Sequence, residues 1–455
     1  MKTKPLAIVV VGHTNAGKTS LLRTLTRDKY FGEVSRRNAT TKHVEQTSVV
    51  IAGKAVLKLF DTPGFEDSIE FRHYLRQFDD GRGRKEMLES FLHSPEAGGR
   101  FEQQAKVVRI LLTKIDAIFY VIDSTEVPLP KYVSELEVLS MCAIPVLPVL
   151  NFIQTEGSHV DNWVSVLADR GLHIKVGFDA MAPLIGSERL LYTRLGNLLD
   201  GHDKQLLDIA DAIEREARGR RESALQAIAE LLIDVSALRA LVPHDDLNEI
   251  KMVTERMHSL VKAAEQTCVS ALLAIHCFDR SDLIEFDLPV IGTKPDDDLF
   301  NPEVIKAASV RLGLGAAIGA AIGLGVDIAL VGVTMGAGAI VGGAVGGMLV
   351  DSAKNLWTWA EAKIRGLVDL AIDQPTLSVL LTRQLQLLAA LNSRSHAAQQ
   401  PLQQDGKAPA DEHWAGLADP INCARAHPEW SRLGGGFVPS EDREKAIGQI
   451  QSLLL

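Results

Sequence analysis

The sequence predicts a layered α/β domain with a mostly parallel sheet, followed by an α-helical domain that carries a glycine-rich helical hairpin. Three observations support this fold class. Short apolar runs rich in β-branched residues alternate with helical patterns through residues 1–185, as in a parallel sheet covered by helices. Apolar residues then recur at helical spacing through residues 186–300. In residues 301–352, several glycines are spaced by four, which gives a helix a flat face for close packing.

The composition limits the classes of protein to which the chain can belong. Its 455 residues are too many for one simple domain, and 46% hydrophobic with 23% charged residues exclude a mainly disordered chain. The net charge of −10 argues against general nucleic-acid binding, which needs a basic surface. Four cysteines without CxxC spacing exclude a zinc ribbon and a disulfide scaffold. We therefore expect a cytoplasmic protein that does not bind nucleic acid.

The expected strands of the α/β domain are short and apolar on both faces. The run at residues 6–11 could pass for the core of a secretory signal, but it leads straight into a glycine-rich turn, so we interpret it as a strand. The other expected strands cover residues 47–51, 56–60, 117–122, 144–150 and 173–177. Between the third and fourth strands, residues 64–115 form a charged excursion. We expect it to hold a mobile switch segment followed by one or two helices.

A phosphate-binding loop is the strongest chemical signal of the sequence. The pattern GxxxxGKT over residues 12–19 directly follows the first strand and precedes an apolar helix. Glycines let backbone N–H groups approach phosphate oxygens, and the helix N-terminus adds its positive dipole. The Lys18 ammonium can neutralise β- and γ-phosphates, and the Thr19 hydroxyl can ligate Mg²⁺. The expected nucleotide-binding residues of this loop are Gly12, His13, Thr14, Asn15, Ala16, Gly17, Lys18, Thr19 and Ser20.

Two further segments fit the same chemistry. Asp61 ends an expected strand and opens the sequence Asp-Thr-Pro-Gly, so its carboxylate can hold Mg²⁺ while the Gly64 N–H senses the γ-phosphate. Thr40 and Thr41 lie in a polar loop between the two motifs. A threonine there can complete the Mg²⁺ shell only when the γ-phosphate is present. Together the segments predict a nucleotide-dependent switch.

These elements resemble the GTPases of the Era and TrmE group, in the translation-factor-related class. Those proteins have a GxxNxGKS/T phosphate loop, paired threonines in the first switch and DTPG or DTAG at the second. Residues 12–19, Thr40 with Thr41, and residues 61–64 match these motifs, and the resemblance covers about the first 180 residues. It implies a P-loop GTPase with Mg²⁺ as cofactor. The whole chain resembles, only in general arrangement, bacterial GTPases of this group with a long C-terminal domain of unknown function.

The resemblance also bears on the rate of hydrolysis. Asn15 stands where several members use an Asn to bind K⁺ in place of an arginine finger, which implies K⁺-stimulated hydrolysis. Phe65 stands where Ras-like proteins place a water-orienting glutamine, so we expect slow intrinsic hydrolysis. Glu66, Asp67 and Glu70 follow closely enough to help. Glu66 is our candidate, and the alternative is that all three belong to a solvated switch loop.

The base-recognition motif departs from the pattern of the group. Residues 113–116 read Thr-Lys-Ile-Asp, close to NKxD, but they precede a strand, and we interpret them as a helix end. The motif belongs after the strand 144–150, where Asn151 can tie this loop to the phosphate loop. Phe152 can stack on a purine there, and Gln154 can accept a hydrogen bond from guanine without a charge. We therefore expect guanine preference in a weakened form.

Two more residues complete the expected base site. Asp179 and Ala180 lie where the group makes its backbone contact to guanine. With the motifs above, they give the full set of expected site residues. The remaining nucleotide-binding residues are Asp61, Thr62, Pro63, Gly64, Asn151, Phe152, Gln154, Asp179 and Ala180. The expected catalytic residues are Lys18, Thr41, Gly64 and Glu66, and the expected metal ligands are Thr19, Thr40, Thr41 and Asp61.

The rest of the chain is expected to be helical, with linkers. A helix is predicted over 352–373, stopped near Pro375, and another over 376–392. Residues 393–412 are rich in Ser, Ala, Gln and Pro and read as a flexible linker. The expected divisions are a GTP-binding domain at 1–185, a helical domain at 186–300, the hairpin at 301–352, a helical segment at 353–392, and a linker with C-terminal tail at 393–455.

The glycine-rich stretch raises the question of a membrane. Residues 312–350 carry one charge, Asp327, and residues 328–350 are long enough for one membrane span. Trp357 and Trp359 follow, as in an interfacial anchor. Two interpretations stay open: contact with membrane lipid, and a soluble helical hairpin buried by the bundle.

The sequence therefore predicts a GTP-binding protein whose Mg²⁺-dependent GTP hydrolysis drives a conformational switch read out by the helical C-terminal domain. Its expected partners are GTP and GDP, membrane lipid through residues 312–350, and a second copy in a nucleotide-dependent homodimer. The expected location is the cytoplasm, with peripheral or integral association at the inner membrane as an option. The alternative is a membrane-inserting or membrane-tethering structural protein in which nucleotide binding is regulatory. An Era-like ribosome assembly factor is disfavoured by the acidic charge.

Overall fold

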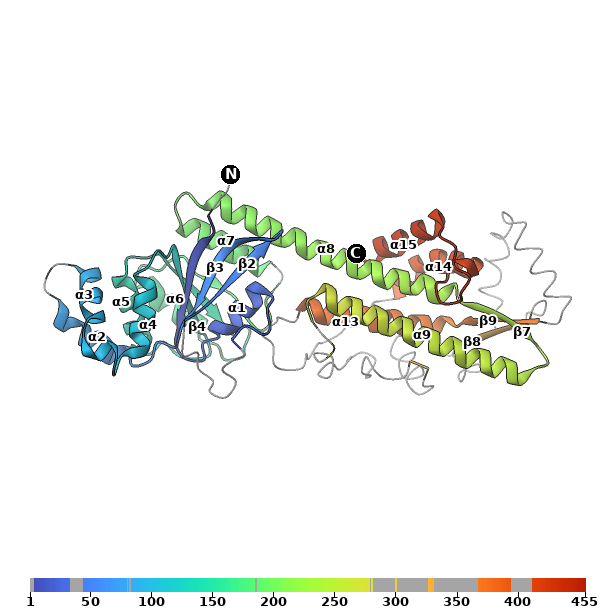
Figure 1. The fold of residues 1–455 in the computed structure, drawn as a ribbon, viewed down its shortest axis with the longest axis horizontal. Coiled ribbons are helices and arrows are strands. Elements are labelled where there is room, and N and C mark those ends of the chain that lie inside the picture. The colour runs from blue at the N-terminus through green and yellow to red at the C-terminus, as the bar shows by residue number, and fades with distance from the viewer. Residues whose placement is uncertain are drawn as a thin grey trace. The chain divides into compact units, whose positions relative to one another are not determined.

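The computed structural model places the chain in two compact units. It describes residues 4–32, 44–79, 81, 83–184, 186–278, 280, 299–300, 326–330, 367–393 and 411–455. The first unit ends at Ala217 and the second begins at Arg218, so the boundary falls within helix α8 (Asp203–Ser236). Each unit has its own sheet and its own buried core (Figure 1).

Unit 1 alternates strands and helices along the chain. Its strands are β1 (Leu6–Gly12), β2 (Glu45–Ile51), β3 (Lys54–Asp61), β4 (Ala117–Asp123), β5 (Val146–Asn151) and β6 (Val176–Gly177). Its helices are α1 (Lys18–Thr26), α2 (Ser68–Leu75), η2 (Arg76–Phe78), α3 (Arg84–Leu92), η3 (Pro95–Ala97), α4 (Glu102–Leu111), α5 (Pro130–Met141), α6 (Val160–Ala168), α7 (Ser187–Leu198) and the first part of α8. The sheet order is β2-β3-β1-β4-β5-β6, and only β2 runs antiparallel to its neighbour. This confirms the predicted α/β fold with a mostly parallel sheet.

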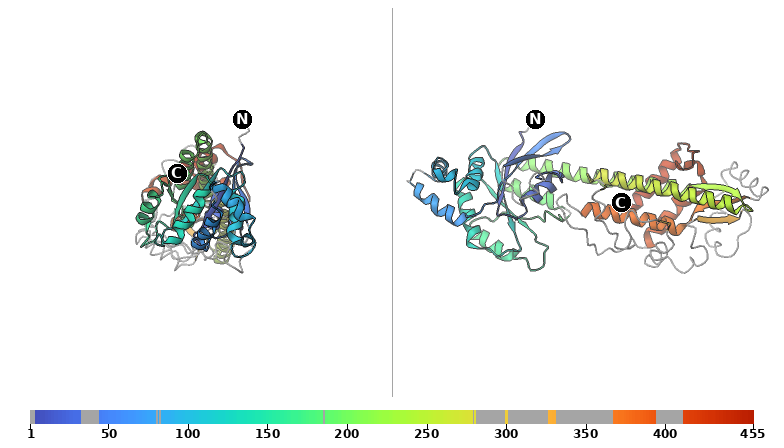
Figure 2. Two further views of the ribbon diagram at one scale, coloured as in Figure 1. Left: turned by 90° about the vertical axis from the view of Figure 1, so that its left-hand side faces the viewer. Right: turned by 60° about the horizontal axis from the view of Figure 1, so that its bottom comes forward.

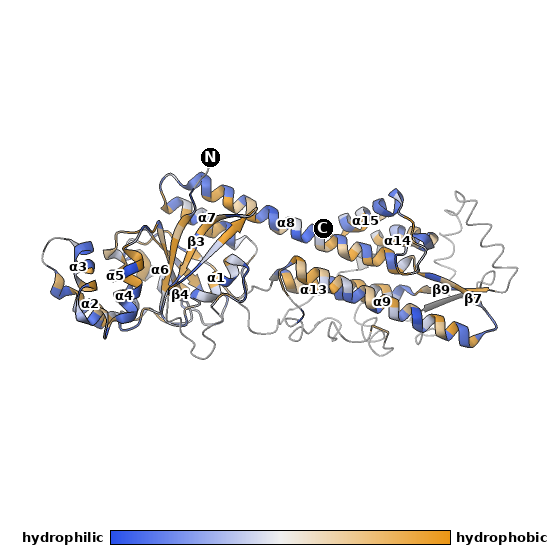
Figure 3. Cartoon of the chain, in the orientation of Figure 1, coloured by the Kyte–Doolittle hydropathy of each residue, from blue (hydrophilic) through white to orange (hydrophobic). Residues whose placement is uncertain are grey.

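The two faces of this sheet bury different helices. Side chains alternate along a strand, so Ile8 and Val10 of β1 point to one face and Val9 and Val11 to the other. The first face packs against α1, α7 and the start of α8, and the second packs against α2 to α6. Figure 2 shows this layering from two further sides, and Figure 3 shows the apolar character of the strands between the helices. These four side chains of β1 are fully buried, as expected for a central parallel strand.

The expected elements of unit 1 are confirmed except in two places. The strand expected at 173–177 pairs only at Val176–Gly177. The excursion at 64–115 holds three α-helices rather than one or two, because glycines near residue 81 and Pro95 interrupt it. Residues 113–116 follow the end of α4, as predicted. There Asp116 Oδ2 accepts a hydrogen bond from the N–H of Ala7 at 2.7 Å, which fastens the helix end to the start of β1.

Unit 2 combines long helices with a three-stranded antiparallel sheet. Its strands are β7 (Arg239–Pro243), β8 (Val326–Leu330) and β9 (Leu367–Ile372), in the order β7-β9-β8. Its helices are the second part of α8, α9 (Leu247–Ile275), α13 (Gln374–Ser393), α14 (Asp411–Ala426), η7 (Pro428–Trp430) and α15 (Glu441–Leu454). The helical region after the α/β domain is thus confirmed.

The sheet of unit 2 corrects two expectations. The helix predicted over 352–373 is wrong for residues 367–372, which form the central strand β9. Across the sheet, Asp369 of β9 forms an ion pair with Arg239 of β7. Pro375 does not stop a helix but lies in the first turn of α13, where Asp373 Oδ1 accepts from the N–H of Thr376 at 2.8 Å. The strand partners of β9 are distant in sequence, so local periodicity could not reveal the pairing.

The glycine-rich hairpin lies largely outside the described residues. Of residues 312–350, the structure describes only 326–330, and these form strand β8 rather than the expected helix. β8 pairs in antiparallel register with β9, for example Leu330 with Val368. Among the described residues no helix is both long and apolar enough to cross a membrane. The linker expected at 393–412 also lies almost wholly outside the described range.

The C-terminal segment is part of the core of unit 2. Trp430, Ile447 and Ile450 are buried against α8 and its neighbours. Asp234 of α8, itself buried, accepts hydrogen bonds from Arg443 Nη2 at 2.9 Å and from Arg432 Nε at 2.7 Å. Helix α15 is therefore fixed to α8 by apolar packing and by the buried Arg443–Asp234 pair, and α14 packs into the same core; the sequence did not indicate either contact.

Candidate functional site

The loop between β1 and α1 has the backbone shape of a phosphate cradle. Asn15 and Gly17 have φ angles of +65° and +95°, in the left-handed region. A β-carbon at Gly17 would stand 2.2 Å from Nδ2 of Asn151, so only glycine fits there. Asn15 itself is exposed. The loop therefore brings its backbone N–H groups to the N-terminus of α1, the arrangement that binds anions.

Lys18 is held inside this loop. It is buried, and its Nζ donates to the carbonyl oxygens of Gly12 at 3.0 Å and His13 at 2.7 Å. Burial lowers the pKa of Lys18, while the nearby carboxylates of Asp61, Glu135 and Glu66 raise it. A buried ammonium at the centre of a phosphate loop can exchange its two carbonyl partners for phosphate oxygens.

Thr19 and Asp61 meet at the mouth of the loop. The Thr19 hydroxyl donates to Oδ2 of Asp61 at 2.7 Å, which joins α1 to the end of β3. Asp61 is fully buried, and its Oδ1 has no hydrogen-bond partner among the described residues. Burial raises the pKa of Asp61, while the Thr19 hydrogen bond and the Lys18 charge lower it. A buried carboxylate with one oxygen unsatisfied, next to a hydroxyl, fits a Mg²⁺ ion, which prefers such hard oxygen ligands.

The second switch lies directly against the phosphate loop. A β-carbon at Gly64 would stand 2.1 Å from Oγ1 of Thr14, and the N–H of Phe65 donates to the carbonyl of Gly12 at 3.2 Å. The Thr14 hydroxyl donates to Oε1 of Glu66 at 2.5 Å. Beside them, Thr62 Oγ1 donates to the carbonyl of Val10 at 2.7 Å. Of the acidic residues expected near the chemistry, Glu66 is thus the one whose side chain contacts the loop.

The other two acidic residues point elsewhere. Glu70 forms an ion pair with Arg100, and Asp67 is exposed at the start of α2. Phe65 is fully buried, with its ring 5.8 Å from that of Phe71. The Phe71 ring in turn lies 4.8 Å from Phe91 of α3 and 5.3 Å from Phe101, just before α4. Phe65, which follows Gly64, therefore packs in an aromatic cluster whose other rings come from α2, α3 and the residue before α4.

A buried carboxylate, that of Glu135, contacts the phosphate loop through His13, and no sequence pattern indicated this contact. Glu135 of α5 is completely buried and lies 2.9 Å from Nδ1 of His13. It also accepts a hydrogen bond from the Tyr120 hydroxyl at 2.7 Å. Burial, and then the charge of Glu135, raise the pKa of Tyr120 well above its ordinary value. A glutamate on an otherwise amphipathic helix gives no sequence signal of this kind, because only the fold brings α5 under the loop.

The base loop is tied to the phosphate loop by Asn151. Its Nδ2 donates to the carbonyl of Ala16 at 3.0 Å, and its Oδ1 accepts from the N–H groups of Phe152 at 3.0 Å and Ala180 at 2.9 Å. Thr24 of α1 donates to the carbonyl of Ala180 at 2.7 Å. The link proposed for Asn151 from the sequence is present in the structure.

Phe152, Gln154 and Asp179 take unexpected positions within that loop. Phe152 has φ +58°, which is rare for an aromatic residue, and the tip of its ring lies beside Gly17. The carboxylate of Asp179 accepts from the N–H groups of Ile153 at 2.6 Å and of Gln154 at 3.1 Å. Gln154 is exposed, and its Nε2 donates to the carbonyl of Ala182 at 3.1 Å. Asp179 therefore shapes the base loop from within.

The structure brings together most of the expected site residues. Residues 12–20, 61–66, 151–154 and 179–180 lie on loops at the carboxyl ends of β1, β3 and β5 or next to β6. Thr40 and Thr41 lie outside the described residues. The expected catalytic and metal roles of these two threonines therefore stay predictions.

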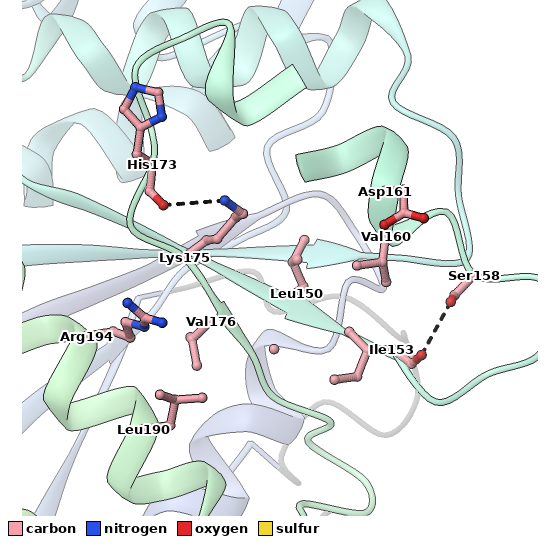
Figure 4. Close-up of a pocket in the computed structure, with 11 residues that line it drawn as sticks. Leu150, Ile153, Ser158, Val160, Asp161, His173, Lys175, Val176, Leu190 and Arg194 are labelled. Atoms are coloured by element: carbon pink, nitrogen blue, oxygen red, sulfur yellow. Dashed lines mark hydrogen bonds between the residues drawn. The ribbon is translucent and has the colours of Figure 1, made fainter. Parts of the chain in front are cut away.

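A separate cavity of about 670 Å³ opens beside β6, at the edge of the sheet (Figure 4). Ile153 of the base loop and Gly177 of β6 lie on its wall, and none of its lining residues belongs to the phosphate loop. The lining is mixed in character and consists of Leu150, Ile153, Ser158, Val160, Asp161, His173, Lys175, Val176, Gly177, Leu190 and Arg194. The cavity therefore lies next to the base loop and is separate from the phosphate loop.

Comparisons with known proteins agree with this geometry. A family model described as 50S ribosome-binding GTPase matches residues 7–152, and one described as a domain of unknown function, DUF3482, matches residues 165–452. No curated protein matches the chain. The P-loop GTPase assignment of unit 1 rests on the first match and on the sheet order and loops described above.

Several solved structures are similar to unit 1. A bacterial selenocysteine-specific elongation factor, EF-Sec, is 18% identical with a TM-score of 0.29, over 43% of this chain and 29% of that one. A probable GTP-binding protein, engB, is 17% identical with a TM-score of 0.27, over 42% of this chain and 97% of that one. The G domain of the T. maritima FeoB iron transporter is 17% identical with a TM-score of 0.24, over 39% and 89%. This chain thus spans under a third of the elongation factor.

Proposed function

Because this chain belongs to the DUF3482 family and carries an N-terminal P-loop GTPase domain, we propose that it binds GTP, hydrolyses it slowly and works as a nucleotide-dependent switch. One observation carries the proposal. Lys18, Thr19 and Asp61 converge at the mouth of the phosphate loop, and Gly64 rests against the same loop. This is the set of groups that phosphoryl transfer requires for positioning and charge stabilisation.

The residues of the chain divide the work among them. Lys18 neutralises charge on the β- and γ-phosphates, and the N–H groups of residues 12–19 bind the phosphate oxygens. Thr19 and Asp61, with Thr40 or Thr41, would hold Mg²⁺, which would supply positive charge against the negative charge that develops during transfer. The Gly64 N–H holds a γ-phosphate oxygen. Loss of the γ-phosphate releases that contact and changes the second switch.

Glu66 is the proposed water-positioning residue. Its carboxylate lies at hydrogen-bonding distance from Thr14, at the edge of the phosphate loop, whereas Phe65 is buried and carries no polar group. A carboxylate can accept a proton from the attacking water and hold it in line. K⁺ bound through the exposed Asn15 is the proposed further source of positive charge. Equal turnover in K⁺ and Na⁺ would remove the K⁺ part of the proposal.

Guanine is the proposed base. Asn151 and Ala180 hold the base loop to the phosphate loop, Phe152 offers a ring for stacking, and Gln154 offers an uncharged acceptor. The test is a competition of GTP and ATP against a fluorescent guanine nucleotide on the full chain, with Lys18→Ala as the control that removes phosphate binding. GTP should compete better than ATP. ATP binding at least as tight as GTP binding contradicts the base assignment.

A role at a membrane is the second proposed feature, and one observation favours it. The stretch 331–366 joins β8 to β9, and Leu330 pairs with Val368, so both ends of this stretch leave from the same end of the sheet. Pro243 of β7 pairs with Leu367 at that same end, and Leu247 just beyond it is 77% exposed. An exposed apolar side chain near a stretch whose first part, 331–350, carries no charge suits contact with lipid.

Flotation of the full chain with liposomes, with a GTP analogue and with GDP, tests the membrane proposal. Binding in one nucleotide state alone would connect the switch to the membrane. Absence of lipid binding in both states ends the membrane proposal. The structural alternative, regulatory nucleotide binding without turnover, is separated by measuring GTP hydrolysis: Lys18→Ala should abolish turnover and function if hydrolysis is the purpose of the protein. A nucleotide-dependent homodimer is checked by light scattering in the same two states.

A further inference from the structure

The segment that follows the second-switch glycine is held in place on two sides. The Thr14 hydroxyl donates to the carboxylate of Glu66, and Gln104 of α4 donates through Nε2 to the Glu66 carbonyl. Phe65, directly before it, is locked in the aromatic cluster. The Glu66 carboxylate therefore has a defined position on the phosphate loop, although its side chain is exposed to solvent.

Charge around Lys18 is the second part of the argument. Three carboxylates, Asp61, Glu135 and Glu66, act on this ammonium. Asp61 is tied to Thr19, and Glu135 is tied to Tyr120 and lies against His13, both inside the fold. Glu66 is the only one of the three that is exposed and attached through a switch segment. It is therefore the one that a newly bound anion can displace without breaking the core.

A second negative group beside the Glu66 carboxylate costs free energy. A γ-phosphate bound at Lys18 and beside Thr14 would meet this carboxylate, which accepts a hydrogen bond from Thr14, and like charges repel. GDP has no γ-phosphate, so its binding leaves the Glu66 carboxylate on Thr14. The Thr14–Glu66 contact thus distinguishes GTP from GDP by the charge of the γ-phosphate.

We propose that Glu66 is a displaceable stand-in for the γ-phosphate charge, which lowers the affinity for GTP relative to GDP and makes triphosphate binding dislodge the second switch. The inference rests on the proposed nucleotide function of the same site. It deepens that function, because it identifies the contact that must break before Glu66 can turn to a catalytic water. Because Phe65 directly precedes Glu66, displacement of Glu66 also moves Phe65 and the helices α2 and α3 whose rings pack in the same cluster.

The test is the ratio of dissociation constants for GDP and a non-hydrolysable GTP analogue, measured by calorimetry on the full chain with Mg²⁺. Glu66→Gln keeps an acceptor for Thr14 and removes the charge. It should tighten the GTP analogue about fivefold and leave GDP within about twofold, which corresponds to about 1 kcal/mol of repulsion at an exposed site. Glu70→Gln is the matched control, since it removes the same charge from the same segment but from the Arg100 pair. Its ratio should equal that of the wild type.

A second variant separates the tether from the charge. Thr14→Ala removes the hydroxyl that holds Glu66 and leaves the carboxylate, so the preference for GDP should fall without disappearing. An unchanged ratio in Glu66→Gln, with both nucleotides bound, overturns this inference and leaves the proposed function intact. An equal change of the ratio in Glu66→Gln and Glu70→Gln also overturns it, because general charge then explains the effect. Failure of the wild type to bind either nucleotide contradicts the proposed function itself.

Discussion

Asn151 donates through its side-chain amide to the carbonyl oxygen of Ala16, at 3.0 Å, and so joins the base loop to the phosphate loop. The same side chain accepts two backbone hydrogen bonds and is 1% exposed. One amide therefore serves three backbone groups that come from the loops after β1, β5 and β6. The nucleotide site is built on this cross-link, because base and phosphate must be bound at a fixed separation.

Removing this cross-link should damage both stability and binding. Asn151→Ala leaves three buried backbone groups without a partner, at about 1–3 kcal/mol for each unsatisfied group that water cannot reach. We expect a lower urea midpoint and at least a tenfold weaker GDP affinity. Asn151→Asp is the informative companion, because it can keep the two accepted bonds but not the donated one. An unchanged affinity in Asn151→Ala would show that the two loops are held together by other contacts.

The buried Asp61 carboxylate should lower the stability of the nucleotide-free protein and favour nucleotide binding. Its pKa is raised by burial, so the folded state favours the protonated form. That contribution to stability is present below the unfolded value of about 4 and is lost as pH rises through the raised folded pKa. At neutral pH the nucleotide-free Asp61→Asn variant should therefore be more stable than the wild type. Its binding of Mg²⁺–GDP should be weakened, since the carboxylate is gone.

Thermal unfolding from pH 4 to 8 checks this behaviour. The gain in Tm of Asp61→Asn over the wild type should grow with pH and vanish at the acid end. Added Mg²⁺ and GDP should raise the Tm of the wild type more than that of the variant. A variant less stable than the wild type at pH 8 would contradict the argument from burial.

Phe65→Gln should not create a Ras-like catalyst. The side chain at this position points into the aromatic cluster, not to the phosphate loop, and is 0% exposed. A buried amide there loses apolar contacts and finds no partner, at about 3 kcal/mol. We expect a lower urea midpoint and no gain in GTP turnover. Phe65→Leu, which keeps the apolar character, should be milder. Faster turnover in the Gln variant would show that the second switch turns this residue toward the nucleotide.

Glu135 should matter to the phosphate loop although it contacts no nucleotide. Glu135→Gln keeps one acceptor oxygen, for the Tyr120 hydroxyl, and its NH2 group can donate to His13 Nδ1, whereas Glu135→Leu leaves the Tyr120 hydroxyl buried without this partner. We expect Glu135→Leu to weaken GDP binding by roughly tenfold and Glu135→Gln to weaken it far less. The size of this difference at equal thermal stability measures how far α5 positions the loop. Equal affinities for the two variants would contradict the positioning role.

The C-terminal helices should be required for unit 2. Asp234→Ala removes the buried carboxylate partner of the buried Arg443 and leaves it with the largely exposed Glu444, and breaking a buried pair costs about 3–5 kcal/mol. We expect α14 and α15 to become protected less well in hydrogen exchange, while unit 1 keeps its GDP affinity. Lys445→Ala, whose pair with Asp442 is exposed, is the matched surface control. Full protection of α15 in Asp234→Ala would show that apolar packing alone fixes these helices.

Local motifs predicted most of unit 1. The phosphate loop, the Asp61 motif and the strands that lead into them follow from residues that are neighbours in sequence, since each motif joins one strand to one loop. The exceptions are contacts over long sequence distances. Glu135 reaches His13 across 122 residues, and Asp179 caps the N–H of Ile153 across 26. No short window of sequence shows that these groups meet.

Residues close together in the sequence were enough to predict a P-loop GTPase fold and its phosphate site, because glycines, lysine and hydroxyl must stand at fixed spacing for a backbone to surround a phosphate. The sheet of unit 2, the attachment of the C-terminal helices and the position of Glu66 on Thr14 depend instead on contacts made by folding. Strand pairing such as Arg239 with Ala371 depends on partners more than a hundred residues apart. Burial of Asp234 likewise depends on which helices cover it, and helical spacing alone leaves both open.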